Sequence, residues 1–146
     1  MSQLSGTANS KSGPQEMPLI ERLKVRSDFL RVAATRRRWA TPGLVLQVAN
    51  TPKEVVKRGT IRVGFTASRK VGDAVTRNRA RRRLRGAVRQ VMPAHAATDR
   101  DFVVIARANT VRRPYADLIA DLETALQKLD VWGNKASPPP EADAAT

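Results

Sequence analysis

The most informative stretch of this sequence is SRKVGDAVTRNRARRRLRGAVRQVM, residues 68–92. Within it, residues 69–89 carry nine lysines and arginines and a single acid, Asp73. From Ala74 onward the apolar residues recur with helical spacing, and five of them fall within a sector of roughly 100°. Those five are Ala80, Leu84, Ala87, Val88 and Val91. The stretch therefore predicts a helix over 74–92, ended by Met92-Pro93, that packs against the rest of the protein by one side.

The other side of this helix is predicted to be basic. A polar stripe is formed at spacings of four, three and four residues by Asn78, Arg82, Arg85 and Arg89. Arginine binds phosphate through two parallel hydrogen bonds, and an amide can bond a sugar or a base edge. An exposed helix usually mixes acids with its bases, and this one does not. We interpret the stripe as a nucleic-acid contact, with an ordinary solvated face as the alternative.

The composition of the whole chain also favours a polyanionic partner. Its 146 residues suffice for one domain, and 27 lysines and arginines against 13 acids give a formal net charge of +14. Without cysteine and with a single histidine, the chain lacks the residues for a disulfide framework, a thiol nucleophile or a histidine-based metal site. No apolar run approaches the length of a bilayer span, and the first residues do not resemble a signal peptide. We therefore expect an intracellular protein that binds nucleic acid and not a membrane.

The segments around the basic helix predict an α+β fold. A first helix is expected to be capped by Ser27, followed by strands over 44–49 and 61–68 that pair with each other. A further short strand over 38–41 is an optional part of the predicted fold. A further strand is expected over 101–107, and a last helix from Pro114 to Gly133. This order, α-β-β-(β)-α-β-α, is typical of a two-layer sandwich with the helices on one face of a small mixed sheet.

The two ends of the chain contain few residues that could pack. We expect residues 1–18 to be a disordered arm, residues 19–132 to be a single folded domain, and residues 133–146 to be a disordered Pro-rich tail. Three carboxylates of the last helix are expected on its polar side, where they would serve solubility: Asp117, Asp121 and Glu123.

Several segments resemble the bacterial ribonuclease P protein subunit. The family's signature is similar to Arg77-Asn78-Arg79 together with residues 68–75 before it and 82–85 after it. The strand before the signature resembles residues 62–65, the strand after it resembles residues 101–107, and Asp28-Phe29 matches the first helix. The resemblance covers about residues 20–130, which is essentially the whole predicted domain.

The family resemblance implies both a topology and an activity. Its members join two parallel strands by a left-handed β-α-β crossover through the signature helix, against the general right-handed rule, as in the second domain of a small-subunit ribosomal protein. The protein joins one catalytic RNA, without an obligate protein partner, and assists removal of the 5′ leader from precursor tRNA in the bacterial cytoplasm. Hydrolysis is performed by Mg²⁺ held mainly by the RNA subunit and the substrate. We therefore expect no catalytic residue and no metal ligand in the protein.

The resemblance also implies which residues contact RNA. Those expected to bind the catalytic RNA are Arg69, Lys70, Arg77, Asn78, Arg79, Arg82 and Arg85, to which the polar stripe of the helix adds Arg89. Those expected to line a cleft for the single-stranded leader, between the first helix and the sheet, are Phe29, Arg36, Gln47 and Phe65. Phe29 fits a base-stacking residue and an ordinary core aromatic about equally. Two aromatic positions of the family are Ala33 and Gln47 here, and Arg36 stands where glycine is common. The cleft is therefore expected to depend more on arginine and hydrogen bonds than on stacking.

Other interpretations of the basic helix remain open. A non-catalytic ribosomal or RNA-chaperone protein would have the same small, arginine-rich composition. A DNA-binding role is less favoured, because no helix-turn-helix or dimerisation pattern accompanies the helix. The run Arg36-Arg37-Arg38 fits a second phosphate contact, and it also fits favourable charge at the C-terminus of a helix.

Overall fold

The computed structural model describes residues 18–133, so the predicted terminal arm and tail lie outside the described residues apart from Pro18 and Gly133. The main elements are β2 (Leu19–Arg22), α1 (Arg26–Ala34), β3 (Arg38–Ala40), β4 (Leu44–Asn50), β5 (Thr60–Thr66), α2 (Ala74–His95), β6 (Arg100–Ala106) and α3 (Tyr115–Lys128). Short 3-10 turns, η1 (Arg69–Val71) and η2 (Ala108–Thr110), precede α2 and α3. Within the described range no helix is both long enough and apolar enough to span a membrane.

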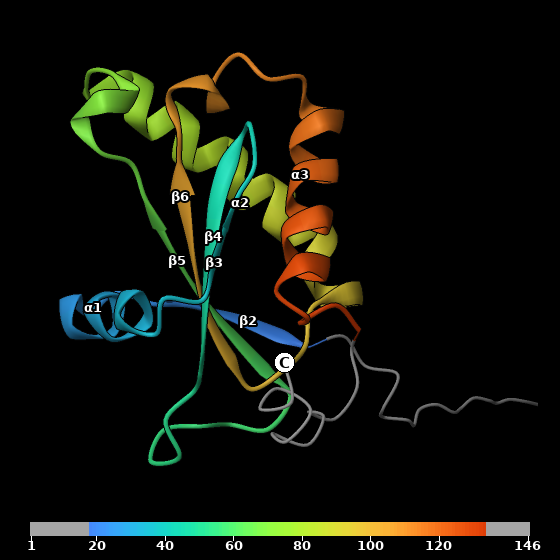
Figure 1. Cartoon of the computed structure of the whole chain (residues 1–146). Coiled ribbons are helices and arrows are strands. Elements are labelled where there is room, and N and C mark those ends of the chain that lie inside the picture. The colour runs from blue at the N-terminus through green and yellow to red at the C-terminus, as the bar shows by residue number, and fades with distance from the viewer. Residues whose placement is uncertain (1–17, 134–146) are drawn as a thin grey trace, which may run out of the picture.

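The strands of the described chain form one mixed sheet in the order β2-β5-β6-β4-β3 (Figure 1). β5 is parallel to β2 and β6, whereas β4 is antiparallel to β6 and β3. The optional short strand is present as β3. The prediction that the strands at 44–49 and 61–68 pair is wrong, because β6 lies between them. The last five residues of β6 are apolar, and six of its seven residues are buried, which suits a central strand. The β5-α2-β6 unit is a parallel crossover, and the left hand expected for it stays a prediction.

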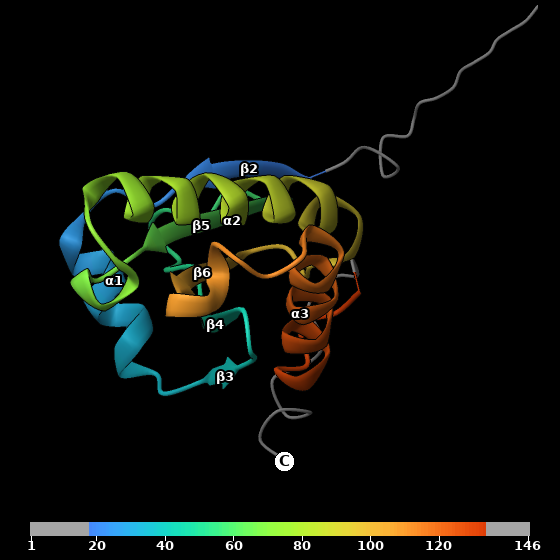
Figure 2. The same cartoon turned by 90° about the horizontal axis from the view of Figure 1, so that it is seen from above.

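The two faces of the sheet are covered by different helices (Figure 1 and Figure 2). Alternate residues of a strand point to opposite faces, so Phe102 and Val104 of β6 join the core under α2 and α3, while Val103 packs with Val32 of α1. The expected α+β fold with a small mixed sheet is present, but the expectation that the helices share one face holds only for α2 and α3. α1 lies on the opposite face, because the outward apolar residues of β4 and β6 would otherwise be exposed there.

α2 is longer than the sequence predicts. It continues through Pro93 to His95, although proline was expected to end it at residue 92. Met92 and Ala96 are fully buried, and the Ala96 N–H donates to the Met92 carbonyl at 2.9 Å. Packing of the last turn therefore outweighs the backbone hydrogen bond that a proline cannot make.

The other helix boundaries also differ from the predicted ones. α1 begins at Arg26 with Val25 in the capping position, so Ser27 lies inside the first turn and caps nothing. α3 ends at Lys128, well before Gly133. β2 was not predicted, since it is short and half exposed. It forms because β5 offers it a parallel edge, with Leu19 opposite Thr60 and Arg22 opposite Val63.

Candidate nucleic-acid interface

The turn before α2 positions the start of the basic helix. Asp73 accepts a hydrogen bond from the Thr76 backbone N–H at 2.8 Å and so caps the helix. Hydrogen bonds from the backbone and the hydroxyl of Thr76 lower the pKa of the Asp73 carboxyl. Gly72 has φ +149°, and a Cβ there would lie 2.8 Å from the Thr76 side chain, so glycine is required. Arg77 donates to the Gly72 carbonyl at 3.1 Å, which fixes this signature arginine against the turn.

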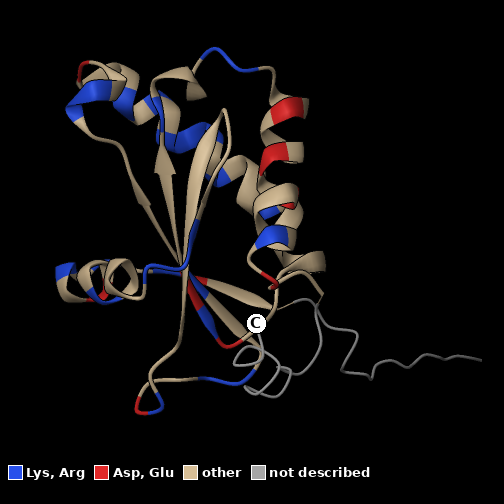
Figure 3. Ribbon diagram, in the orientation of Figure 1, with Lys and Arg blue, Asp and Glu red and all other residues tan. Residues whose placement is uncertain are grey.

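α2 is buried along one side and basic along the other, as predicted. The buried residues of the helix are Ala80, Leu84, Ala87, Val88, Val91 and Met92. On the other side Asn78, Arg79, Arg82 and Arg89 are exposed, and Arg77 and Arg85 are half-buried. Figure 3 shows the basic residues following α2 along much of its length, whereas α3 displays several acidic ones. The helix therefore packs by its apolar residues and presents guanidinium groups to solvent.

Arg69 and Lys70 extend this basic side beyond the helix. Both lie in η1 and are exposed, and Ser68 caps the turn by accepting a hydrogen bond from the Lys70 N–H at 3.3 Å. The structure thus brings all the residues predicted to bind the catalytic RNA onto η1 and α2. We call them the α2 basic surface: Arg69, Lys70, Arg77, Asn78, Arg79, Arg82, Arg85 and Arg89.

One arginine of the same run has a structural role instead. Arg83 points to the loop before α3, where its guanidinium donates to the carbonyl of Val111 at 3.4 Å and to that of Arg113. Neighbouring positions on a helix point in different directions, so the exposed Arg82 and the half-buried Arg83 serve different purposes. An arginine run in a sequence therefore overstates the number of free guanidinium groups.

Two of the predicted leader-cleft residues lie together on the α1 face of the sheet. Phe29 packs over Gly64 of β5, where a Cβ would collide with the phenyl ring. Its ring is half-buried beside Val32 and Val103. Gln47 of β4 lies on the same face by the alternation of the strand, and it is only 8% exposed. Phe29 is therefore partly a core residue, and it remains half-buried rather than enclosed.

Phe65 lies on the opposite face, so the prediction that it lines one cleft with Phe29 is wrong. It follows Ile61 and Val63 on β5 at intervals of two residues, and all three pack into the core under α2. A strand's side chains alternate between faces, and Gly64, one position earlier, is the residue that meets Phe29.

The arginines predicted to contact the leader or phosphate follow the end of α1. The Thr35 hydroxyl donates to the carbonyl of Val48 at 2.9 Å, which ties the helix end to β4. Arg36 follows with φ +60°, the left-handed conformation that glycine adopts most easily, and it is exposed. Arg37 donates to the Leu129 carbonyl at 2.5 Å and so connects this segment to the end of α3. Of the arginine run at 36–38, Arg37 is thus structural, while the other two remain exposed.

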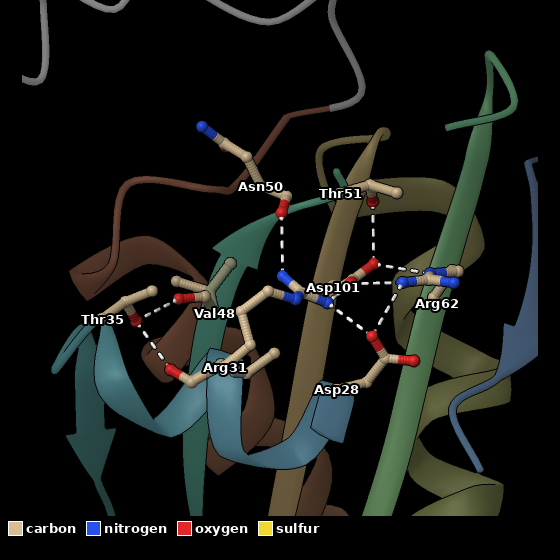
Figure 4. Close-up of polar contacts among 9 residues, drawn as sticks. Asp28, Arg31, Thr35, Val48, Asn50, Thr51, Arg62 and Asp101 are labelled. Carbon is tan, nitrogen blue, oxygen red and sulfur yellow. Dashed lines mark hydrogen bonds and ion pairs between the residues drawn. The ribbon is translucent and has the colours of Figure 1, made fainter. Parts of the chain in front are cut away.

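An ionic network on the α1 face was not predicted (Figure 4). Its centre is Asp101 of β6, whose carboxylate is fully buried. Arg62 of β5 donates to it at 2.9 and 2.8 Å, Thr51 donates at 2.8 Å, and Arg31 of α1 donates as well. Arg31 also bonds Asp28 at 3.1 Å. The network therefore connects α1, β5 and β6 through a single carboxylate.

The network perturbs the titration of its own members. Burial by itself raises the pKa of Asp101, but hydrogen bonds from Arg62, Arg31 and Thr51 outweigh it and hold that pKa below its usual value. The hydrogen bond to Asp101 raises the pKa of Arg62 in return. The signal available in the sequence was Arg62 in the alternating strand β5 and Asp101 at the start of β6, because charged residues need a partner when a sheet is covered on both faces.

The acids of α3 do not all serve solubility. Asp121 is 7% exposed, and its carboxylate accepts hydrogen bonds from Arg113 at 2.7 and 3.1 Å. It also accepts the backbone N–H of Gly43 at 3.0 Å, where a Cβ would overlap the carboxylate. The solubility prediction is therefore wrong for Asp121, which fixes α3 to the start of β4.

The described residues do not offer a metal site. No three histidine, cysteine, aspartate or glutamate side chains come together between residues 18 and 133 in a way that could hold a metal ion. The buried carboxylate of Asp101 is already satisfied by guanidinium and hydroxyl groups.

The chain is similar to proteins of one family over most of its length. A family model described as Ribonuclease P matches residues 17–130. A protein of Paramagnetospirillum magneticum named "Ribonuclease P protein component" is 56% identical over 110 residues, which is 75% of this chain and 83% of the relative. A protein of Caulobacter vibrioides with the same name is 44% identical over 122 residues, 81% of this chain and 79% of the relative.

Solved structures agree with this similarity. The RNase P protein of Staphylococcus aureus matches with a TM-score of 0.63 and 28% identity, over 77% of this chain and 97% of that one. The RNase P protein of Thermotoga maritima, at 24% identity, shares the fold with a TM-score of 0.61 over 74% of this chain and 96% of that one. Because the family model spans residues 17–130 and a relative is 56% identical over three quarters of the chain, this chain belongs to the ribonuclease P protein family.

Proposed function

We propose that this chain is the protein subunit of ribonuclease P in the bacterial cytoplasm, where it binds the ribonuclease P RNA in a 1:1 complex through the α2 basic surface. The observation that carries the proposal is the state of that surface. Its cationic side chains are exposed or half-buried, and none of them forms a salt bridge within the described part of the chain. Phosphate groups are the natural counterions for such a row of arginines.

The physical contribution of the protein is electrostatic. Arginines on α2 release counterions from RNA phosphates and reduce the repulsion between the catalytic RNA and precursor tRNA. Precursor tRNA and Mg²⁺ then bind to the catalytic RNA at a lower Mg²⁺ concentration than they do without the protein. Mg²⁺ held by the RNA and the substrate would activate the water that cleaves the phosphodiester bond between leader and tRNA, and no step of the hydrolysis is assigned to a protein side chain.

The α1 face is the proposed site for the 5′ leader. Phe29 offers its half-buried ring, and Arg36 offers an exposed guanidinium at the end of α1. Gln47 is nearly buried, so only a small part of its amide can reach a ligand. Leader contact is therefore expected to depend on Arg36 and Phe29, with little demand on base identity.

Cleavage of precursor tRNA at low Mg²⁺ by a bacterial ribonuclease P RNA, with and without this chain, tests the proposal. We expect equimolar chain to restore cleavage at the correct 5′ site, and the chain without RNA to cleave nothing. Tight RNA binding without restored cleavage would contradict the proposal and favour a ribosomal or RNA-chaperone role for the same helix. In the same assay Arg82→Ala should weaken assembly of the chain with the RNA, and Arg82→Lys, which keeps the charge, is its matched control.

A further inference from the structure

A small pocket lies between β2, β5 and α2, on the α2 side of the sheet. Its volume is about 290 Å³, at the lower end of the range of roughly 300–1,000 Å³ found for small-molecule sites. Six side chains line it: Ile20, Arg22, Phe65, Arg85, Val88 and Arg89. A pocket of this size admits one flat group and excludes a double helix.

The lining has an apolar part and a basic part. Ile20 and Phe65 are half-buried and Val88 is 2% exposed, so together they form an apolar floor with one aromatic ring. The arginines come from two elements that are distant in the sequence, β2 and α2. They meet here because β2 adds to the sheet alongside β5, over which α2 passes (Figure 2). No acidic residue is among the six.

The three arginines of the pocket have no counterion in the described part of the chain. None of Arg22, Arg85 and Arg89 takes part in a salt bridge between residues 18 and 133. Burial first, and then repulsion by Arg22 and other arginines, lowers the pKa of Arg85. A bound anion would relieve this repulsion, and guanidinium groups match phosphate geometry best.

From this arrangement we infer that the pocket takes a single unpaired nucleotide of an RNA strand, with its phosphate on Arg22, Arg85 and Arg89 and its base against Phe65. The inference rests on the proposed function, since the nucleotide belongs to the RNA that covers α2. The pocket opens on the face opposite Phe29, so this nucleotide is not part of the leader. Stacking on an aromatic ring accepts any base, so the site reads the presence of an unpaired base and not its identity.

Adenosine 5′-monophosphate, inorganic phosphate and adenosine are suitable probes, titrated separately into the full chain and followed by calorimetry. We expect the monophosphate to bind at least about fivefold more tightly than inorganic phosphate, because stacking of a base on an aromatic ring contributes about 1 kcal/mol or more. Phe65→Leu, which keeps an apolar side chain, should remove this advantage and leave phosphate binding intact. Arg85→Ala should weaken both ligands. Arg112→Ala removes an exposed arginine outside the pocket and should change neither.

A second variant covers the case in which Phe65→Leu fails to fold. Ile20→Trp, on the edge strand β2, should fill the pocket and abolish monophosphate binding. The inference is overturned if the monophosphate binds no better than phosphate, or if a folded Ile20→Trp variant binds it normally. It is also overturned if ribonuclease P RNA binds the chain without displacing the monophosphate. In each of these cases the restored cleavage of precursor tRNA, measured separately, still decides the proposed function.

Discussion

Arginines on the two faces of the sheet are in opposite situations. On the α1 face Arg31 and Arg62 surround the buried carboxylate of Asp101, and Asp28 lies beside them. On the other face the α2 basic surface forms no salt bridge within residues 18–133. Arg31 and Arg62 therefore join secondary structure elements on one face, whereas the arginines of the α2 basic surface have no acidic partner among the described residues on the other.

The difference between the faces lies in the acids and not in the arginines. A cation held against a sheet needs a counterion, since charge is costly to remove from water without a partner. An exposed arginine is solvated and needs none. The position of the few acids in this basic chain thus marks the arginines that form salt bridges, whereas Arg37 and Arg83 are held by backbone carbonyls.

Removing the central acid should cause the largest effect. Asp101→Ala leaves Arg31 and Arg62 without their shared partner, and we expect a loss of about 3 kcal/mol in the free energy of unfolding, the low end for a broken buried pair because Arg31 partly reaches solvent. Urea denaturation measures it. Glu54→Ala, in an exposed loop, is the control and should change stability by less than about 0.5 kcal/mol. Equal effects of the two changes would show that the network does not hold the α1 face.

The same carboxylate should make stability depend on pH. The pKa of Asp101 is lowered in the folded chain, so its contribution is complete above the ordinary aspartate pKa of about 3.9 and is lost as the pH falls through the lower folded value. The difference in unfolding free energy between the parent chain and Asp101→Asn should be constant from pH 7 to about 5 and shrink below about 4. A difference that stays constant down to pH 3 would contradict the lowered pKa.

Variants of Arg36 distinguish the free-energy cost of its backbone conformation from the contribution of its side chain to leader binding. Its φ of +60° is unfavourable for a residue with a Cβ, so Arg36→Gly should stabilise the fold by about 1 kcal/mol. The same change should weaken leader binding in the reconstituted enzyme. Arg36→Ala removes the side chain but keeps the strain, so it should weaken leader binding without the gain in stability. Unchanged leader affinity in both variants would remove Arg36 from the leader site.

On the α2 basic surface the smallest change in stability should accompany a clear change in RNA binding. Arg82→Ala should shift the unfolding free energy by less than about 0.5 kcal/mol, because this side chain is exposed and unpaired within the described chain. The slope of log affinity for ribonuclease P RNA against log salt should fall by about one unit. A large loss of stability with an unchanged salt slope would mean that Arg82 has a structural role, as Arg31 and Arg62 have, and does not contact phosphate.

Local patterns were predicted well and long-range pairings were not. The buried and basic sides of α2 follow from helical spacing alone, so the sequence was enough to place Leu84 inside and Arg82 outside. The strand segments follow from alternation in the same way. The strand order and the face on which Phe65 lies depend on which strands meet, and no spacing within one segment contains that information.

The buried acids illustrate the same limit. From the sequence Asp121 is predicted to be a solvated residue of a helix, but its carboxylate accepts hydrogen bonds from Gly43 and Arg113. Asp101 is the second residue of β6, next to Arg100, yet its partners come from segments up to 70 positions away in sequence. Each of these contacts forms only when segments that are distant in the sequence pack together.

By itself the sequence determined the α+β class, the amphipathic basic helix and the family to which the chain belongs, because helical and strand periodicity and an ordered motif are properties of neighbouring residues. The tertiary structure alone decided that α1 covers the second face, that Asp101 neutralises Arg31 and Arg62, and that Arg22 joins the arginines of α2 beside Phe65. Charge neutralisation and pocket formation are set by which distant segments share a desolvated space, and only the folded chain defines that space.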